Sequence, residues 1–565
     1  MGAAVPMNLL PEMVEAGARR MVTPLRVWGR RTWLYRRLLK GPLADHIAFP
    51  PHDACARRLE DADALLRGRF RFLGEVVGVP QGISVFDLPP PSQAWLEELH
   101  GFCWLASLAA AGGEAARTLA TNLIAQWVKR YGHYCEPQWL PHVLARRLLH
   151  IFSHGRLVVL NSDIMWRSKL FVSLREQARM LERIAGEAPD GLPRLEAACA
   201  LALSGLCLDD NSKRLRAGLM RLEGELARQI LPDGGHVSRS PEDLLHAYRH
   251  LVMISDALAA ANGEPPHTLR NALDRMAPML RFFRHGDGAL ALFQGGQESD
   301  PKLVAGLLAR DDVRGQPFGH ARHSGYQRLA AGRTLIQLDC GEVPKGVLSA
   351  KAHAGFLAFE MSSGSHRLVV NCGASGKKHR VWDAPLRATA AHSTLTLADR
   401  SSAEILPPGL ARELLGPRLV GGPTDASTQR SETPLGWMVE AGHDAYVPEL
   451  GYRHERQITL SPQGLMVTGA DRLVPVRSLR GRVEFNLRFH IHPDVRVSRL
   501  EGGAVLLKLP NGEGWRFRAG GGELRIDESV YLGGETVRRT HQLVVTGEAR
   551  QSPVEAAWVF EQIVV

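Results

Sequence analysis

The spacing of apolar residues changes once along this chain of 565 residues, and the change falls near residue 320. Before it, apolar residues recur every three or four positions, as in the segment 94–111 (AWLEELHGFCWLASLAAA), which is typical of an amphipathic helix. After it, the segments become short and rich in β-branched residues, and Gly, Pro, Asp or Asn separates them. We therefore predict an all-helical half followed by a large antiparallel β half.

The two halves divide into individual elements. Short connections such as APDG and NGEPP between the helical segments indicate antiparallel helical hairpins. Helices are expected at 94–111, 115–131, 139–154, 166–186, 192–207, 212–231, 241–262 and 266–284. Strands are expected at 334–340, 356–363, 366–373, 393–399, 455–461, 465–473, 483–492 and 504–510. Many short strands without helices between them predict sheets stacked as a sandwich, and we place the domain boundary at residue 318.

The composition and the motifs limit the function classes. The chain has a formal net charge of +10 and a pI of about 9.4, so its surface attracts polyanions. Charge alone does not separate nucleic acid, acidic lipid and acidic polysaccharide, but no nucleic-acid-binding motif accompanies it, so no nucleic-acid partner is expected. The sequence also contains no P-loop, GxGxxG, GxSxG or HExxH motif, so nucleotide hydrolysis, hydride transfer and serine or zinc protease chemistry have no support.

The cysteines and the N-terminus bear on the compartment. Seven scattered cysteines without a CxxC pair indicate reduced residues rather than a disulfide framework or a zinc knuckle. The N-terminus lacks the residue order of a secretory signal, and the sequence contains no apolar run long enough to span a membrane. We therefore expect a cytoplasmic protein, and the periplasm is the alternative.

The segment 16–43 is strongly basic. It contains eight Arg or Lys residues and no acid, and Trp28, Trp33 and Tyr35 are interleaved with these charges. Such a stretch is typical of a peripheral contact with an anionic membrane surface. The alternative is a solvated helical lead-in whose charges have no partner.

Six different stretches of the chain contain recognisable motifs. They are WLEELHGFCWL (95–105), LPDGGHVSRSP (231–241), KAHAGFLAFE (351–360), VVNCG (369–373), RATAAHST (387–394) and RFHIHPDV (488–495). In order and spacing they resemble the motifs of the heparinase II/III-like family of polysaccharide lyases. The resemblance implies an N-terminal (α/α) toroid at 1–318 and a C-terminal antiparallel β-sandwich at 319–565.

The same resemblance implies a reaction. Lyases of this family cleave an acidic, uronic-acid-containing polysaccharide by β-elimination: a base removes the C5 proton, a cation neutralises the carboxylate and an acid protonates the leaving oxygen. Lys351 stands where the family has its first catalytic His, and we predict it as the base, with His236 as the acid. Arg239 and Arg387 are predicted to bind the uronate carboxylate, because arginine forms a bidentate pair with it.

Other positions also differ from the family. His353 and His392 keep two positions of the family's metal site, and Asn371 stands in place of its Asp, so the resemblance implies a divalent metal, Zn or Ca, bound by these three residues. Two His and an amide make a weaker site than two His and a carboxylate. The family's Asn–His pair is absent near 192–194. Its Tyr is absent as well, and Tyr248, about one helical turn further on, is the predicted substrate contact.

Three hypotheses remain for these residues. The first is an altered lyase site with Lys351 as the base. The second is a non-catalytic site, in a protein that binds acidic glycan or is associated with polysaccharide biosynthesis. The third is a scaffold, in which His353 and His392 cap strands and Arg387 pairs with an acid. In the first two, the partner is an acidic polysaccharide or oligosaccharide.

Overall fold

The chain forms two compact units. The computed structural model describes residues 9–42, 44–53, 59–160, 162–208, 212–310, 317–375, 380–477, 481–534 and 536–563. The helical unit consists of Ala4–Ile230 and His246–Asp274, and the β unit contains Leu231–Leu245 and Arg275–Val565. Cys55 lies outside the described residues, and the other six cysteines are free thiols. The domain boundary at residue 318 stays a prediction.

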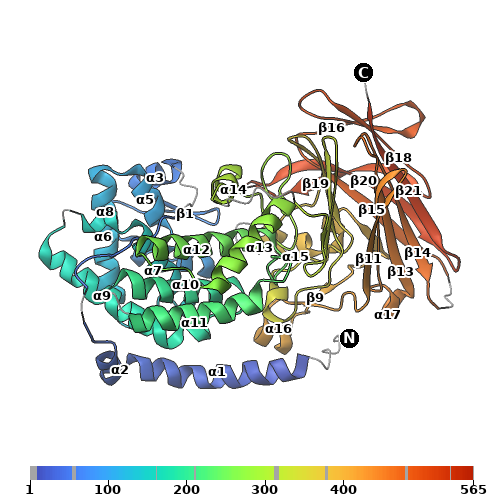
Figure 1. Cartoon of the computed structure of the whole chain (residues 1–565). Coiled ribbons are helices and arrows are strands. Elements are labelled where there is room, and N and C mark those ends of the chain that lie inside the picture. Colours follow the sequence, from blue (N-terminus) through green and yellow to red (C-terminus); the bar gives the residue numbers. More distant parts are fainter. Residues whose placement is uncertain are drawn as a thin grey trace. The chain divides into compact units, whose positions relative to one another are not determined.

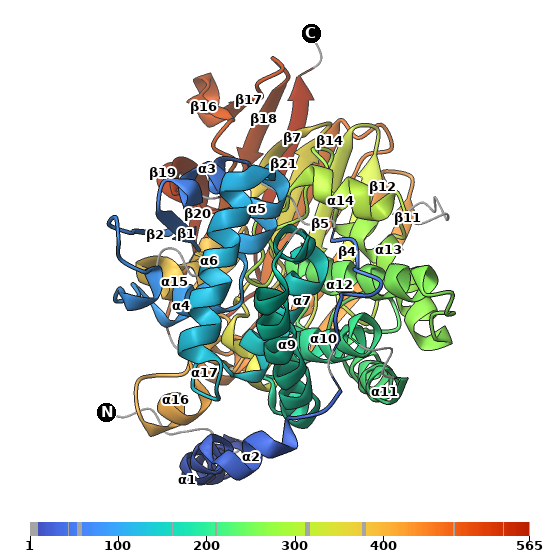
Figure 2. The same ribbon diagram turned by 90° about the vertical axis from the view of Figure 1, so that its left-hand side faces the viewer.

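The first part of the chain is a series of helices, coloured blue to green in Figure 1. They are α1 (Leu10–Arg31), α2 (Trp33–Leu38), α3 (Leu59–Leu66), α4 (Gln93–His100), α5 (Trp104–Ala111), α6 (Gly113–Tyr131), α7 (Pro141–His154), α8 (Arg156–Val159), α9 (Ile164–Ile184), α10 (Leu192–Cys207), α11 (Ser212–Gln229), α12 (Pro241–Ala260), α13 (His267–Phe283) and α14 (Pro301–Leu308). In the helical unit α10 packs against α7 and α11, and α7 packs against α9 (Figure 2). A hairpin of β1 (Arg69–Phe72) and β2 (Glu75–Gly78) lies between α3 and α4 in the sequence.

The single helix predicted at 94–111 is wrong, because two helices occupy this segment. Ser92 caps the first helix, and its Oγ accepts the N–H of Trp95 at 3.1 Å. The chain leaves the helix at Gly101, and Phe102 adopts a positive φ of 60°. The spacing of apolar residues does not reveal this break, because Phe102 within the break and Trp104 at the start of the second helix are both buried.

Two antiparallel sheets form the β unit, as the change of period predicts. The eight-stranded sheet has the order β11 (Ala426–Thr433), β12 (Gly436–His443), β13 (Tyr452–Leu460), β14 (Met466–Pro475), β21 (Val554–Ile563), β18 (Gly514–Ala519), β17 (Val505–Lys508) and β16 (Arg496–Arg499). The nine-stranded sheet has the order β19 (Glu523–Tyr531), β20 (Arg538–Ala549), β15 (Val483–Ile491), β7 (His366–Val370), β6 (Phe359–Ser363), β5 (Thr334–Asp339), β4 (Tyr326–Ala331) and β3 (His320–Ala321), and β8 (Leu395–Leu397) pairs with β15. The predicted fold class, a helical toroid followed by an antiparallel β-sandwich, is confirmed.

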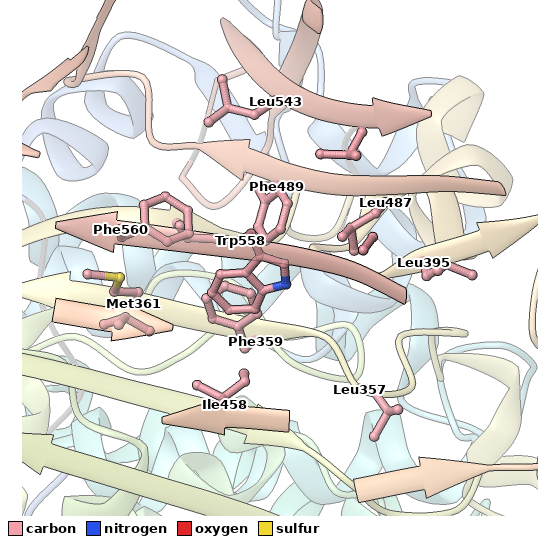
Figure 3. Close-up of a cluster of buried hydrophobic side chains, with 14 of the residues drawn as sticks. Leu357, Phe359, Met361, Leu395, Ile458, Leu487, Phe489, Leu543, Trp558 and Phe560 are labelled. Atoms are coloured by element: carbon pink, nitrogen blue, oxygen red, sulfur yellow. The ribbon is translucent and has the colours of Figure 1, made fainter. Parts of the chain in front are cut away.

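Aromatic side chains from both sheets meet in the core of the sandwich (Figure 3). Phe359 of β6 stacks on Trp558 of β21, with ring centres 5.5 Å apart and planes 2° from parallel. Phe489 of β15 contacts the same indole ring edge-on at 5.1 Å. Because these residues alternate with outward-facing positions along their strands, the period of two places them all on the inner faces.

Two long connections leave the nine-stranded sheet and carry most of the predicted site residues. The β5–β6 connection contains the 3-10 helix η4 (Gly346–Ala350). The β7–β8 connection contains α15 (Arg380–Arg387) and the 3-10 helix η5 (Thr389–Ala391). Elsewhere the β unit includes a small pair of strands, β9 (Glu404–Ile405) and β10 (Leu419–Val420), and the helices α16 (Leu410–Leu415) and α17 (Val447–Leu450).

The aromatic stack predicts a large effect of one truncation. Phe359→Ala removes a fully buried ring and leaves a cavity beside Trp558, which should lower the free energy of unfolding by about 3–5 kcal/mol. Calorimetry of the full chain measures the loss as a lower Tm of the β unit. Leu435→Ala is the control, since this side chain is 75% exposed at a hairpin and should change stability by less than about 0.5 kcal/mol. Equal Tm values for the two variants would contradict the prediction.

Candidate functional site

The predicted site residues of the β unit lie on three segments. His236 and Arg239 follow the Asp-Gly-Gly turn, Lys351 and His353 lie between β5 and β6, and Asn371, Arg387 and His392 lie between β7 and β8. The turn needs glycine at Gly234, because its φ is 87° and a Cβ there would lie 2.0 Å from the carbonyl oxygen of Arg275. The carboxylate of Asp233 then accepts the backbone N–H groups of His323 and Ser324 at 2.8 and 2.7 Å, which fixes the turn.

Arg239 is buried, and its guanidinium group is engaged inside the β unit. Nε and Nη1 donate to the carbonyl oxygens of Ser324 and Glu342, both at 2.8 Å, and Nη2 pairs with Asp339. The guanidinium carbon lies 4.7 Å from the ring centre of Tyr326. Burial opposes the charge, but the carboxylate of Asp339 raises the pKa of Arg239. Binding a uronate would leave the buried Asp339 without its counter-charge, so the geometry disfavours the predicted role in substrate binding.

Arg387 fastens the connection that carries Lys351. Its Nε, Nη1 and Nη2 donate to the carbonyl oxygens of Ala352 (3.0 Å), Pro417 (2.8 Å) and Ser349 (3.0 Å). The scaffold hypothesis expected an acid as the partner of Arg387. Three main-chain carbonyl groups are its partners instead, because buried carbonyl oxygens also require a hydrogen-bond donor. The side chain is buried, so a role of Arg387 in holding a uronate stays a prediction that would require these bonds to break.

The predicted acid–base pair also differs from expectation. Lys351 is exposed, so the desolvated environment that would make it an effective base is absent. His236 is buried, and its Nδ1 accepts the backbone N–H of Ser238 at 3.1 Å. Burial and then the charge of Lys351 lower the pKa of His236. A neutral imidazole is a poor proton donor, so this geometry disfavours His236 as the acid.

His353 and His392 meet, although they lie on different connections. Nδ1 of His353 and Nε2 of His392 are 3.2 Å apart, and the rings are nearly perpendicular. Nδ1 of His392 donates to the carbonyl oxygen of Ala388 at 2.9 Å, so its Nε2 is the acceptor and His353 the donor. Burial lowers the pKa of both imidazoles, to about 4 for His392, so the pair is neutral.

Asn371 does not complete a metal site with this pair. Its Nδ2 donates to Glu360 Oε1 at 3.1 Å, and its Oδ1 accepts the backbone N–H of Ser393 at 3.0 Å. Glu360 is fully buried, and an Asp at position 371 would place a second carboxylate against it. The Asn amide supplies a donor instead. The two imidazoles are hydrogen-bonded to each other and the amide is engaged with Glu360 and Ser393, so the three residues do not fit a divalent metal, and no chemical step is assigned to one.

Tyr248 is the predicted substrate contact of the helical unit. It lies on α12, and its side chain is 3% exposed. Burial of this degree is typical of a core position. Its role in substrate binding stays a prediction.

A buried ion network underlies both long connections. Asp471 of β14 accepts hydrogen bonds from Arg456 Nε at 2.8 Å, His454 Nε2 at 2.7 Å and Trp558 Nε1 at 2.9 Å. Burial acts to raise the pKa of Asp471, but Arg456 and then His454 outweigh it and lower the pKa to about 2. Nη1 of Arg456 donates to the carbonyl oxygen of Ser393, next to His392, at 2.9 Å. The network therefore anchors the β7–β8 connection to the opposite sheet.

Two residues that position the site were missed in the sequence. Asp339, at the end of β5, pairs with Arg239 and accepts a hydrogen bond from Gln294 Nε2 at 2.8 Å. Gln294 Oε1 in turn accepts the backbone N–H of His353 at 3.1 Å. The available signal was a single acid inside the apolar strand TLIQLDC, since an acid in such a run needs a buried partner.

Comparison with known proteins assigns the family. Residues 313–559 match the family described as heparinase II/III-like, C-terminal. FtsZ-localized protein C of Caulobacter vibrioides is 31% identical over 519 residues, which cover 90% of this chain and 89% of that protein. The chain belongs to the heparinase II/III-like family. The resemblance seen in its motifs is therefore confirmed.

Solved structures agree on the fold of this heparinase II/III-like chain. The crystal structure of heparinase III matches with a TM-score of 0.72 and 15% identity, covering 98% of this chain and 91% of that one. A mutant of the heparan sulfate lyase HepC from Pedobacter heparinus matches with a TM-score of 0.61 and 14% identity, covering 100% and 92%. At such low identities the likeness establishes the toroid and sandwich, and the family supports a polysaccharide lyase only at the family level.

The neutral buried histidines predict acid sensitivity. Burial lowers the pKa of His392 to about 4 and of His490 to about 3, against about 6.5 in an unfolded chain. Their contribution to stability is complete above the unfolded value and is lost as the pH falls from it towards the folded values, so Tm should fall between about pH 6.5 and about pH 4. His490→Gln should flatten this decrease, by up to about 1.4 kcal/mol per pH unit. A variant profile as steep as that of the wild type would contradict the assignment.

Proposed function

We propose that this chain binds an acidic polysaccharide through the β unit and does not cleave it by the family's usual chemistry. The observation that carries the proposal is that the guanidinium groups of Arg239 and Arg387 already have partners within the β unit. Both donate hydrogen bonds to main-chain oxygens, and Arg239 also forms an ion pair with Asp339. β-Elimination needs a free cation on the uronate carboxylate, because the C5 proton is otherwise too weakly acidic for a side-chain base. Membership of the family supports a polysaccharide as the ligand.

The remaining groups favour binding over proton transfer. Lys351 presents an exposed ammonium group at the predicted site, and buried His236 beside it is neutral. The ammonium group of an exposed Lys pairs with a carboxylate or sulfate as a point charge. The net charge of +10 adds a long-range attraction for polyanions. β-Elimination with Lys351 as the base stays the second candidate for the same site.

An assay that measures cleavage and binding separately tests this proposal. We expect no rise in the ultraviolet absorbance of an unsaturated uronate on any member of a panel of uronic-acid polysaccharides, but measurable binding to at least one. Lys351→Ala should weaken that binding about tenfold, or ~1.4 kcal/mol. Lys345→Ala is the matched control, because it removes the same charge from an exposed position of the same connection and should have a much smaller effect.

Two outcomes would overturn the proposal. An absorbance rise that Lys351→Ala abolishes would establish the lyase and restore Lys351 as its base. An absence of both cleavage and binding across the panel would remove the β unit as a glycan site and leave the scaffold hypothesis.

A second function is proposed for the N-terminus, namely peripheral contact with an anionic membrane. Among the described residues no helix is long and apolar enough to cross a membrane. The observation in favour is α1, which buries none of its side chains. Its exposed large apolar residues are Leu10, Val14, Met21, Val22, Leu25 and Trp28, and those of α2 are Trp33, Leu34 and Leu38.

The orientation of α1 supports this second proposal. Arg30, near its C-terminal end, donates to Glu187 at 2.5 Å and to the hydroxyl of Tyr134 at 3.3 Å within the helical unit. Trp28 lies about 200° from Arg30 around the helix, so the apolar face points away from these partners. An apolar stripe that faces outward and is flanked by arginines fits the interface of an anionic bilayer.

Vesicle sedimentation with two charge-matched variants tests the membrane contact. Leu25→Glu places a carboxylate on the apolar stripe and should reduce binding to anionic vesicles at least about tenfold. Thr23→Glu adds the same charge on another side of the helix and should retain most of the binding, because the buried apolar area is unchanged. Equal losses in the two variants would mean that charge alone attracts the chain and that α1 does not insert.

The compartment and the cellular site are also proposals. We place the protein in the cytoplasm, with the periplasm as the alternative, and the membrane contact would then be with the cytoplasmic leaflet. The name of the Caulobacter vibrioides relative, FtsZ-localized protein C, supports co-localisation with FtsZ for this chain as well. A fluorescent fusion imaged together with FtsZ tests both, and a diffuse cytoplasmic signal would contradict the co-localisation.

A further inference from the structure

A cluster of two histidines and an aspartate lies in the helical unit, outside the site described above. Among the residues that the structure describes, Asp53, His150 and His154 form one group whose ligand atoms all lie within 4.8 Å of one another. His154 Nε2 and Asp53 Oδ2 are 3.1 Å apart, although the two residues are separated by 101 positions. Asp53 and His154 are buried, and His150 is half-buried.

The spacing on α7 places both imidazoles on one side. His150 and His154 are four residues apart on this helix, and their rings are roughly parallel with centres 6.1 Å apart. The His residues of an HExxH metal site have the same spacing. Here Ile151 stands where that motif has its Glu, so the segment HIFSH keeps the two ligands but not the general base.

The protonation states suit a metal ligand set. Burial, followed by the neighbouring His154, lowers the pKa of His150 to about 3, so its imidazole is neutral and can coordinate at neutral pH. Burial acts to raise the pKa of Asp53, but Arg249 and His154 outweigh it and hold the carboxylate ionised. In the described part of the chain no hydrogen bond reaches either ring nitrogen of His150, whose ring lies against that of His154.

Arg249 is the main objection to a cation at this position, because its Nε lies 3.1 Å from Asp53 Oδ1. It occupies one carboxylate oxygen, however, while the other, Oδ2, faces His154. A partner on the far oxygen is the usual means of orienting a coordinating carboxylate. The guanidinium charge weakens the affinity for a cation but leaves the donor geometry intact.

We propose that Asp53, His150 and His154 bind one divalent transition metal ion, with zinc as the best fit, and that this ion fastens residue 53 to α7. Two imidazoles and a carboxylate suit zinc better than calcium or magnesium, which prefer all-oxygen ligands. Ligand atoms around a tetrahedral zinc lie about 3.4 Å apart, close to the separation of Asp53 and His154 already present. In such a site Nε2 of His154 would coordinate the metal, and water would fill the fourth position.

Zinc titration of the full chain after removal of metals by EDTA tests this site. His150→Gln is the main variant, because the imidazole makes no hydrogen bond that its loss would break. His142→Gln is the matched control, a half-buried histidine two turns earlier on the same helix. We expect His150→Gln to bind one zinc fewer per chain than the wild type and the control, as counted by elemental analysis.

A second measurement separates a specific site from adventitious zinc. At zinc concentrations about 100-fold above Kd, the wild type and His142→Gln should gain about 5 °C or more in Tm, and His150→Gln should gain none. A cobalt-loaded wild type should also show a visible ligand-field absorption that His150→Gln lacks. If His150→Gln fails to fold, Asp53→Asn, which keeps the side-chain size, takes its place. Equal zinc content and equal Tm gain in the variant and the wild type, or no bound zinc at all, would overturn the proposal.

Discussion

The β unit depends on how it accommodates one carboxylate that has no access to water. Asp471 lies inside the sandwich, where an unpaired charge would cost several kcal/mol, so each of its oxygens must be paired. Arg456 and His454 of β13 and Trp558 of β21 meet that requirement. Because Arg456 also donates to carbonyl oxygens of the site connections, the pairing of one buried acid fixes the distance between the two sheets and the loops above them.

The same rule recurs at the two acids closest to the candidate site. Asp339 is paired by Arg239 and Gln294, and Gln294 holds the backbone of His353. Glu360 is paired by His285 Nε2 at 3.0 Å and by groups of the β7–β8 connection. Arg239 and Asn371, which the sequence predicts as substrate and metal contacts, are here the partners of buried carboxylates. These two polar groups of the predicted site therefore contribute to the stability of the β unit.

The fold class could be predicted from the sequence because the pattern of apolar residues that determines helices and strands is a local property of the chain. A period of 3.6 or of 2 is set by neighbouring residues, so the change near residue 320 gave the two architectures correctly. The break inside 94–111 could not be predicted, because Phe102 has the apolar character that a continuous helix would also show. The spatial pairing of His353 with His392 followed from family order. The structural role of Arg239 could not be predicted, because the acid in the strand TLIQLDC indicates that Asp339 needs a partner but does not identify Arg239, 100 positions away, as that partner.

The contact between Asn371 and Glu360 has a consequence for substitution at position 371. A single substitution of Asn371 by Asp would set two carboxylates against each other inside a fully buried environment. An acidic metal ligand at position 371 therefore also requires a change that removes or neutralises Glu360, so that two coordinated substitutions are needed where one would be expected.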